Sequence, residues 1–237
     1  MKQQLSKPEE ILAVLVLAAA GMFNSSAGET QTIIPGKDQK INLLTLGDSH
    51  TENKVYTNEA FRILTAAGRA TATHRCYGFG GRTAAQLLAM VKEKQLDLST
   101  DPKSLNILCL MVGTNGYDVA QQKELCSTLV AAGWRVVVLT CPPRRGPDTN
   151  SGAGGPGSNG GYNEELRKLY PKLQPGKLET VQLVDIVPPL LDQALIGRGE
   201  WTDTKYNGDN VHLNEAGYKL IGKTVGEALL SLYDAAK

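Results

Sequence analysis

The sequence lacks the features that mark metal-binding, nucleic-acid-binding or membrane-spanning proteins. It contains only four cysteines and three histidines in 237 residues, and no two cysteines form a C-x-x-C pair, which disfavours a structural metal site. Basic residues (25) nearly balance acidic ones (24), and no basic run carries interleaved aromatic residues. We therefore expect no nucleic-acid partner. No apolar run approaches the ~20 residues of a bilayer span, so we expect no membrane span in the mature chain.

Length and composition instead fit one globular domain with a full core. The chain is 41% hydrophobic and 21% charged, which is ordinary for a folded domain. Cys76, Cys109 and Cys141 lie in apolar runs or at their ends, which indicates buried thiols. With Cys126 the cysteine count is even, and one or two disulfides remain open at this point.

The N-terminal segment has the features of a secretory signal. Two lysines precede an apolar run at 11–20, and Ser25 and Ala27 suit the −3 and −1 sites of a signal peptidase. This pattern favours a signal peptide over residues 1–27 and a secreted or periplasmic protein.

The same segment also fits a helix of the folded protein. Ser6 lies three residues before Glu9, as in a capping box, and Pro8 suits the first turn of a helix. A helix here would favour a cytoplasmic protein. In either case residues 28–40 form a linker or leading segment before a domain that spans 41–237.

From residue 41 onward, short apolar runs alternate with helical periodicity. We expect strands over 41–47, 70–78, 105–113 and 134–143, and a fifth strand that runs into a short helix over 180–195. We expect helices over 59–68, 83–94, 119–133, 162–173 and 214–236. This alternation predicts an α/β domain with a five-stranded parallel sheet covered by helices on both faces. Ligands bind such sheets at the carboxyl ends of the strands.

Residues 144–161 (RRGPDTNSGAGGPGSNGG) form a Gly-rich stretch without an apolar anchor. Such a composition predicts a surface loop, and it follows the fourth strand at the edge where ligands bind. A substrate-contacting loop and a solvated insertion are both open interpretations.

The segment LLTLGDSHTEN (43–53) places a serine directly after the first buried strand. Ser49 is expected at a strand-to-helix turn, where backbone N–H groups carry positive partial charge. Both features suit a nucleophile that must also stabilise an oxyanion. Alone, Gly-Asp-Ser is more often a turn or a helix cap.

The segment DNVHLN (209–214) pairs a carboxylate with an imidazole. Asp209 lies three residues before His212, close enough to turn back and bind one ring nitrogen. The other nitrogen can then accept the proton of a serine. His50 and His74 have no carboxylate at this spacing, so they are poorer candidates for the base.

Two further turns offer donors for an oxyanion. Gly81 follows the second strand in FGGRTAAQLL (79–88), and its N–H is not obstructed by a side chain. Asn115 follows the third strand in LMVGTNGYD (110–118), and its amide donates at any working pH. Either motif alone is more often a plain turn.

Taken together, the motifs GDSH, GGRT, GTN and DNVH resemble blocks I, II, III and V of the SGNH (GDSL-type) hydrolases, in the same order. The resemblance covers about residues 41–235. It implies a three-layer α/β/α, flavodoxin-like fold, a catalytic triad of Ser49, His212 and Asp209, and an oxyanion hole of Ser49, Gly81 and Asn115. It implies no cofactor and no metal.

The sequence departs from the family pattern in blocks II and III. Gly116 stands where block III often has Asp, and block II often has an Asn near Cys76 and a Ser near Gly80. The GGRT form is closer to members that act on acetylated polysaccharides. The resemblance therefore implies a serine esterase for short acyl esters, with acetyl groups on carbohydrate as the expected substrate. An acyltransferase, a longer-chain lipase or thioesterase, and a catalytically silent carbohydrate-binding module remain alternatives.

Overall fold

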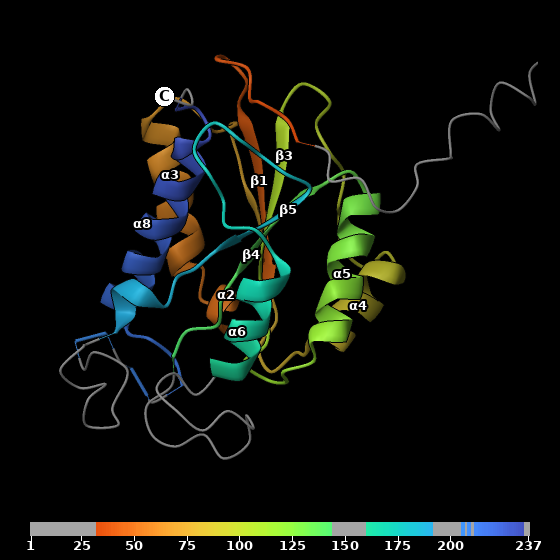
Figure 1. Ribbon diagram of the computed structural model, residues 1–237, viewed down its shortest axis with the longest axis vertical. Coiled ribbons are helices and arrows are strands. Elements are labelled where there is room, and N and C mark those ends of the chain that lie inside the picture. The colour runs from red at the N-terminus through yellow and green to blue at the C-terminus, as the bar shows by residue number, and fades with distance from the viewer. Residues whose placement is uncertain (1–31, 144–159, 192–204, 207, 210, 235–237) are drawn as a thin grey trace, which may run out of the picture. The chain divides into compact units, whose positions relative to one another are not determined.

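The described part of the chain is built around five parallel strands (Figure 1). The computed structural model describes residues 32–143, 160–191, 205–206, 208–209 and 211–234, all within the unit 31–237. The predicted signal or helix over 1–27 lies outside the described residues, and so does nearly all of the Gly-rich stretch 144–161.

The sheet has the strand order β2-β1-β3-β4-β5. Its strands are β1 (Ile41–Gly47), β2 (Arg75–Gly78), β3 (Leu105–Met111), β4 (Arg135–Leu139) and β5 (Val181–Val184). The predicted five-stranded parallel sheet is therefore confirmed, with the order of a flavodoxin-like sheet. The strand order reverses between β1 and β3, which is where such sheets form a ligand-binding crevice.

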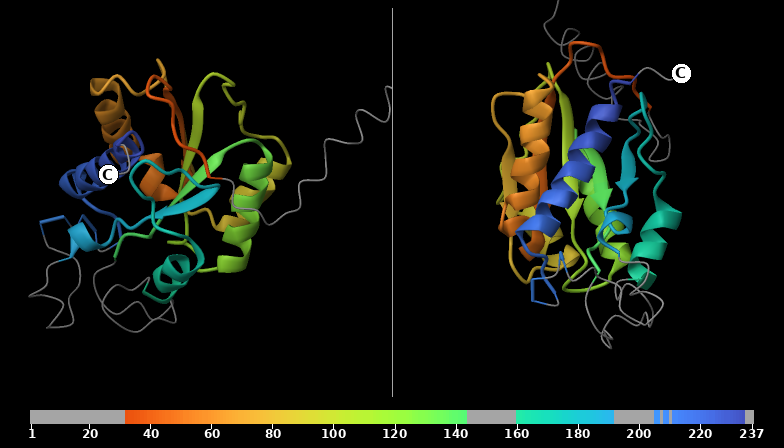
Figure 2. Two further views of the ribbon diagram at one scale, coloured as in Figure 1. Left: turned by 45° about the horizontal axis from the view of Figure 1, so that its top comes forward. Right: turned by 90° about the vertical axis from the view of Figure 1, so that its left-hand side faces the viewer.

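Helices cover both faces of the sheet, as predicted (Figure 2). Helices α3 (Val55–Ala66) and α8 (Glu215–Ser231) pack together on one face. Helices α4 (Ala84–Lys92), α5 (Val119–Ala131) and α6 (Gly160–Leu169) cover the other. A short 3₁₀ helix, η1 (Pro188–Leu190), follows β5 on the side of α8.

Neighbouring residues of the central strands enter opposite cores, which explains their nearly continuous apolar runs. Leu43 and Ile107 lie in the core beneath α3 and α8, whereas Leu44 and Leu108 lie in the core beneath α4 and α5. All four are fully buried. Each such side chain contributes about 1.5–3 kcal/mol on burial. The central strands are thus fixed from both sides, and so are the loops at their ends.

Several element boundaries differ from those predicted. Helix α3 begins at Val55 rather than 59, and its first turn contributes the fully buried Tyr56 to the core. Strand β2 is shorter than predicted, since Ala70 forms only an isolated bridge to Ile41. Helix α6 ends before Pro171, which cannot continue the backbone hydrogen bonding of a helix.

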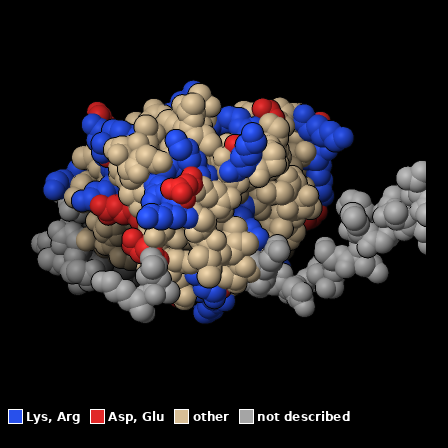
Figure 3. Space-filling view, turned by 90° about the horizontal axis from the view of Figure 1, so that it is seen from above, with Lys and Arg blue, Asp and Glu red and all other residues tan. Residues whose placement is uncertain are grey.

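Of the three cysteines expected to be buried, Cys109 and Cys141 are, whereas Cys76 on the edge strand β2 is only partly buried. All four cysteines are free thiols, and Cys109, Cys126 and Cys141 are buried. Figure 3 views the chain from the edge at which β1 begins, and there Lys and Arg intermix with Asp and Glu. Among the described residues, no helix is both long and apolar enough to cross a membrane.

Candidate active site

Ser49 is the first residue of the short helix α2 (Ser49–Glu52), directly after β1. A Cβ at Gly47 would lie 2.2 Å from the Thr51 hydroxyl and 2.3 Å from the Met111 carbonyl oxygen, so only glycine fits there. Asp48 caps α2, since its side chain accepts from the His50 N–H (3.1 Å). This turn puts Ser49 directly beyond the carboxyl end of β1, where Gly47 pairs with Met111 of β3.

His212 lies within hydrogen-bonding distance of both predicted partners. Its Nε2 is 2.8 Å from Ser49 Oγ, and its Nδ1 is 2.9 Å from the Asp209 carboxylate. The fold thus joins residues that are 163 positions apart in the sequence. The three residues form one hydrogen-bonded chain from carboxylate to hydroxyl.

The Asp209 carboxylate is held by its own loop. Its Oδ1 accepts from the backbone N–H groups of His212 (2.6 Å) and Val211 (3.0 Å). These bonds and the imidazole lower the pKa of Asp209 to about 2. An ionised carboxylate only accepts, so the Nδ1 of His212 carries the proton and Nε2 is left to accept from Ser49.

Gly81 occupies a tight turn after β2. The Arg82 N–H donates to the Phe79 carbonyl (3.2 Å), and Gly81 has a φ of 73° at the third position of this turn. A type II turn requires that conformation, which glycine adopts without strain. The turn lies beside α2, since a Cβ at Gly80 would be 2.6 Å from the Glu52 carboxylate.

Asn115 lies in the turn after β3 and reaches the turn after β2. Its side-chain amide donates to the Arg82 carbonyl (3.2 Å). Gly116, which replaces the Asp of the family pattern, donates its N–H to the Gly113 carbonyl (3.1 Å) and closes the turn. The two loops that carry the predicted oxyanion donors are therefore tied together.

Comparison with known proteins identifies the fold. No protein-family model matches the chain, and no curated protein matches its sequence. Among solved structures, a protein assigned as an acylhydrolase from Bacteroides fragilis has a TM-score of 0.56 at 18% identity, over 85% of this chain and 91% of the other. A GDSL-like lipase from Bacteroides thetaiotaomicron has a TM-score of 0.55 at 15% identity, over 92% and 96% of the two chains.

A third structure agrees with these two. A protein assigned to the lipolytic G-D-S-L family from Desulfitobacterium hafniense has a TM-score of 0.52 at 13% identity, over 79% of this chain and 98% of the other. The chain has the SGNH hydrolase fold. At these sequence identities the likeness is one of fold, and the chemistry depends on the residues of the site itself.

The burial of two polar residues beside Ser49 in this SGNH fold was not predicted from the sequence, which presented His50 only as a poorer candidate for the base. Asp48 is fully buried, and burial raises the pKa of its carboxyl group to about 6, although contacts with His50 and Thr114 oppose part of the increase. His50 is also fully buried, with its Nδ1 2.9 Å from the Tyr218 hydroxyl. Their adjacency to Ser49 was the available signal, but burial cannot be recognised in a lone G-D-S-H.

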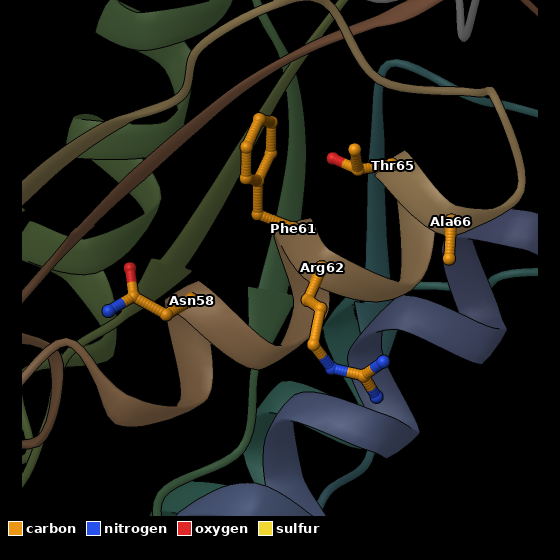
Figure 4. A pocket seen from close by; sticks show the side chains of 5 residues that line it. All are labelled: Asn58, Phe61, Arg62, Thr65 and Ala66. Atoms are coloured by element: carbon orange, nitrogen blue, oxygen red, sulfur yellow. The ribbon is translucent and has the colours of Figure 1, made fainter.

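His74, the third histidine, lies away from this site of the SGNH fold. Its ring packs on Phe61 at a centroid distance of 4.5 Å. Phe61 lines a surface cavity of about 500 Å³ along α3 (Figure 4), whose lining contains none of the predicted site residues. Within the described ranges, no three His, Cys, Asp or Glu side chains gather in a way that could hold a metal ion.

Proposed function

We propose that this chain is a serine esterase that hydrolyses short-chain acyl esters. Ser49 is the nucleophile, His212 the general base and acid, and Asp209 the residue that orients the imidazole. The observation that carries this proposal is the continuous hydrogen-bonded chain from Asp209 through His212 to the Ser49 hydroxyl. This is the geometry that activates a serine for attack on a carbonyl carbon.

In the first step Ser49 Oγ attacks the ester carbonyl while its proton passes to Nε2 of His212. The imidazolium forms beside the ionised carboxylate of Asp209, which stabilises its charge. His212 then donates the proton to the departing alcohol, which leaves an acyl group on Ser49. A water molecule, deprotonated by His212, attacks that acyl group, and the proton returns to Ser49 as the acid is released.

The negative charge of each tetrahedral intermediate needs donors that are already in place. We propose the N–H of Ser49, the N–H of Gly81 and the amide of Asn115. The N–H of Ser49 lies in the first turn of α2, where backbone donors have no partner within the helix. The second N–H of the Asn115 amide is not the one that donates to Arg82, so it can serve the oxyanion.

We propose short acyl groups, with acetyl groups on carbohydrate as the expected substrate. The Gly-rich stretch 144–161, which follows β4 in the sequence, contains no large apolar side chain that would suit a long alkyl chain. The GGRT motif also resembles the form found in esterases of acetylated polysaccharides. The protein would be secreted, and cleavage after Ala27 in the exported chain would support this.

The experiment is hydrolysis of p-nitrophenyl esters from acetyl to dodecanoyl by the wild-type chain and by Ser49→Ala. We expect the highest kcat/KM for the shortest esters and loss of activity in Ser49→Ala. Ser127→Ala, an exposed serine on α5, is the matched control and should keep full activity. An optimum beyond about eight carbons would contradict the short-acyl proposal.

Two alternatives are separated by further measurements. An acyltransferase would pass the acyl group to an added sugar in preference to water, which the product ratio measures. A catalytically silent carbohydrate-binding module would not react with an organophosphate, whereas the proposed esterase should be labelled at Ser49. Labelling that persists in Ser49→Ala would show that another residue reacts.

A further inference from the structure

The residue after the nucleophile, His50, connects three parts of the candidate site. Its backbone N–H donates to Asp48, its Nδ1 lies 2.9 Å from the Tyr218 hydroxyl, and its ring faces His212. No part of His50 is exposed to solvent. A histidine of this kind is not a proton carrier to solvent, and its contacts point to a role in placing other groups.

The ring of His50 lies between two other rings. Its centroid is 5.2 Å from that of His212, at an interplanar angle of 54°. Its centroid is 5.9 Å from that of Tyr218, at 56°. Both are tilted contacts at the usual distance for packed aromatic pairs. The ring of His50 therefore provides a buried packing surface for the imidazole of His212, on the side of that imidazole that faces the protein interior.

Tyr218 links this surface to the loop that carries the base. It lies in the first turns of α8, the helix that begins after His212 with Asn214 as its cap. Burial raises the pKa of Tyr218 above its usual value, while contacts with the Leu213 backbone and the Asn53 side chain oppose part of that increase. Tyr218 is therefore a neutral phenol at working pH, and it contacts the neighbours of both Ser49 and His212.

The bond to Asp209 alone is a weak means of fixing the imidazole. The side chains of His212 and Asp209 are 38% and 62% exposed. Exposed ion pairs contribute only about 0–1 kcal/mol, because water competes for both partners. An imidazole held by that pair alone would rotate among several orientations. Catalysis needs the one in which Nε2 faces Ser49 Oγ.

We propose that His50 and Tyr218 are positioning residues for His212, which fix the plane of its imidazole against Ser49. The inference rests on the proposed esterase function and names residues outside its triad and oxyanion hole. His50 supplies the packing surface, and Tyr218 fixes the His50 ring through its hydroxyl. Two carboxylates lie beside these rings. Asp48 accepts a hydrogen bond from the backbone N–H of His50, and Asp209 binds the Nδ1 of His212.

Three variants separate the ring contact from the polar contact. His50→Asn keeps a polar group near the position of Nδ1 but removes the ring that His212 packs on. His50→Phe keeps the ring but removes the bond to Tyr218. Tyr218→Phe removes only the hydroxyl. A misplacement of about 1 Å costs roughly 10²-fold in rate, so we expect His50→Asn to lower kcat by about 10–10²-fold, with KM unchanged.

His50→Phe should recover much of the kcat that His50→Asn loses, because it restores a ring for His212 to pack on. We expect His50→Phe and Tyr218→Phe each to lower kcat by about three- to tenfold, again with KM unchanged. In an Asp209→Asn background, His50→Asn should cause a smaller loss than in the wild type, because both residues act through His212. A merely structural role of His50 would give additive losses and no recovery with Phe.

His74→Asn and Tyr170→Phe are the matched controls. His74 also packs on an aromatic ring, and the Tyr170 hydroxyl also meets a buried side chain, that of Gln122 (3.2 Å). Neither lies at the candidate site, and both should keep the wild-type kcat. If His50→Asn does not fold, Tyr218→Phe decides, and a wild-type kcat in that variant would overturn the inference.

The same assays distinguish failure of the inference from failure of the proposed function. If the wild-type chain and Ser49→Ala show equal hydrolysis, the proposed function is wrong. If Ser49→Ala is inactive while folded His50→Asn keeps the wild-type kcat, only the positioning role is wrong.

Discussion

The side-chain amide of Asn115 donates a hydrogen bond to the backbone carbonyl of Arg82 over 3.2 Å. This bond connects the turn after β3 to the turn after β2, on either side of the loop that carries Ser49. Arg82 directly follows Gly81, so the two proposed oxyanion donors outside α2 are held in one arrangement before any substrate binds. Donors fixed in advance need no reorganisation when charge develops, which is what makes an oxyanion hole effective.

Replacing Asn115 by Ala should therefore lower kcat by about 10²–10³-fold with little change in KM, since the lost donor acts mainly on the transition state. Steady-state kinetics with p-nitrophenyl acetate measures this. Asn58→Ala, on α3, is the control and should be unaffected. A kcat within twofold of wild type would remove Asn115 from the oxyanion hole.

Gly81→Ala tests the turn after β2 against a site of the same backbone geometry. Gly81 and Gly68 have φ values of 73° and 69°, and a Cβ at either would meet no atom within 4 Å. Each alanine should cost about 1–2 kcal/mol in stability from backbone strain alone. We expect equal losses in urea denaturation, but a loss of kcat only in Gly81→Ala, because its methyl group would obstruct the substrate oxygen that approaches the neighbouring N–H. Equal kcat values in the two variants would argue against a role for the Gly81 N–H.

Asp209→Asn should lower kcat by a factor that does not change with pH above about pH 8. An amide can bind the wrong tautomer of His212, and a buried triad carboxylate replaced in this way loses about 10⁴-fold. We expect a smaller loss, about 10²-fold, because Asp209 is exposed and water can partly replace it. With a pKa of about 2, Asp209 stays ionised throughout the assay range, so the wild-type to variant ratio should be flat from about pH 8 to 9, above the range in which imidazoles ordinarily titrate.

The control for this prediction is Asp97→Asn. Asp97 is an exposed carboxylate that pairs with Arg75, and both residues lie far in the sequence from Asp209 and His212. This variant should keep the wild-type kcat at every pH. A wild-type to Asp209→Asn ratio that changes between about pH 8 and 9 would contradict a carboxylate that is fully ionised there.

Asp48→Asn should alter how stability depends on pH. Burial raises the pKa of Asp48 from 3.8 to about 6, so the folded state holds its proton more tightly than the unfolded state. The resulting stabilisation is full below about pH 4 and is lost as the pH rises through about 6. The asparagine keeps the acceptor for the His50 N–H but has no charge to bury.

Urea denaturation at several pH values measures this effect. The wild-type free energy of unfolding should fall relative to that of Asp48→Asn between about pH 4 and 7, by roughly 3 kcal/mol at most. Curves that stay parallel over this range would mean that Asp48 has an ordinary pKa in the folded protein.

The sequence allowed the sheet and its helices to be predicted because the strands are buried on both faces. Runs such as 105–111 are almost continuously apolar, so they lack the periodicity of an amphipathic helix. Glycines mark where several elements end. Ser49 and His212 were identified as partners because the order of the motifs places them at one edge of a parallel sheet. Their contact follows from the topology.

The roles of His50 and Asp48 could not be predicted in the same way. Whether a polar residue beside a nucleophile faces solvent or the interior depends on what packs over it. For His50 that includes Tyr218 of α8, from the far end of the sequence, and for Asp48 it includes Thr114 after β3. The start of α3 was missed for a related reason. Its first turn contains Tyr56, whose burial in the core was not recognised from the sequence.

The 163 positions that separate Ser49 from His212 mean that the proposed ester hydrolysis requires the C-terminal segment to be in place. Until α8 docks beside α3, the serine hydroxyl is chemically an ordinary alcohol with no base near it. A chain that has formed its central strands but not this last helix would be inert toward esters. The rate at which activity returns after dilution from denaturant should therefore follow the docking of the C-terminal helix rather than the formation of the sheet.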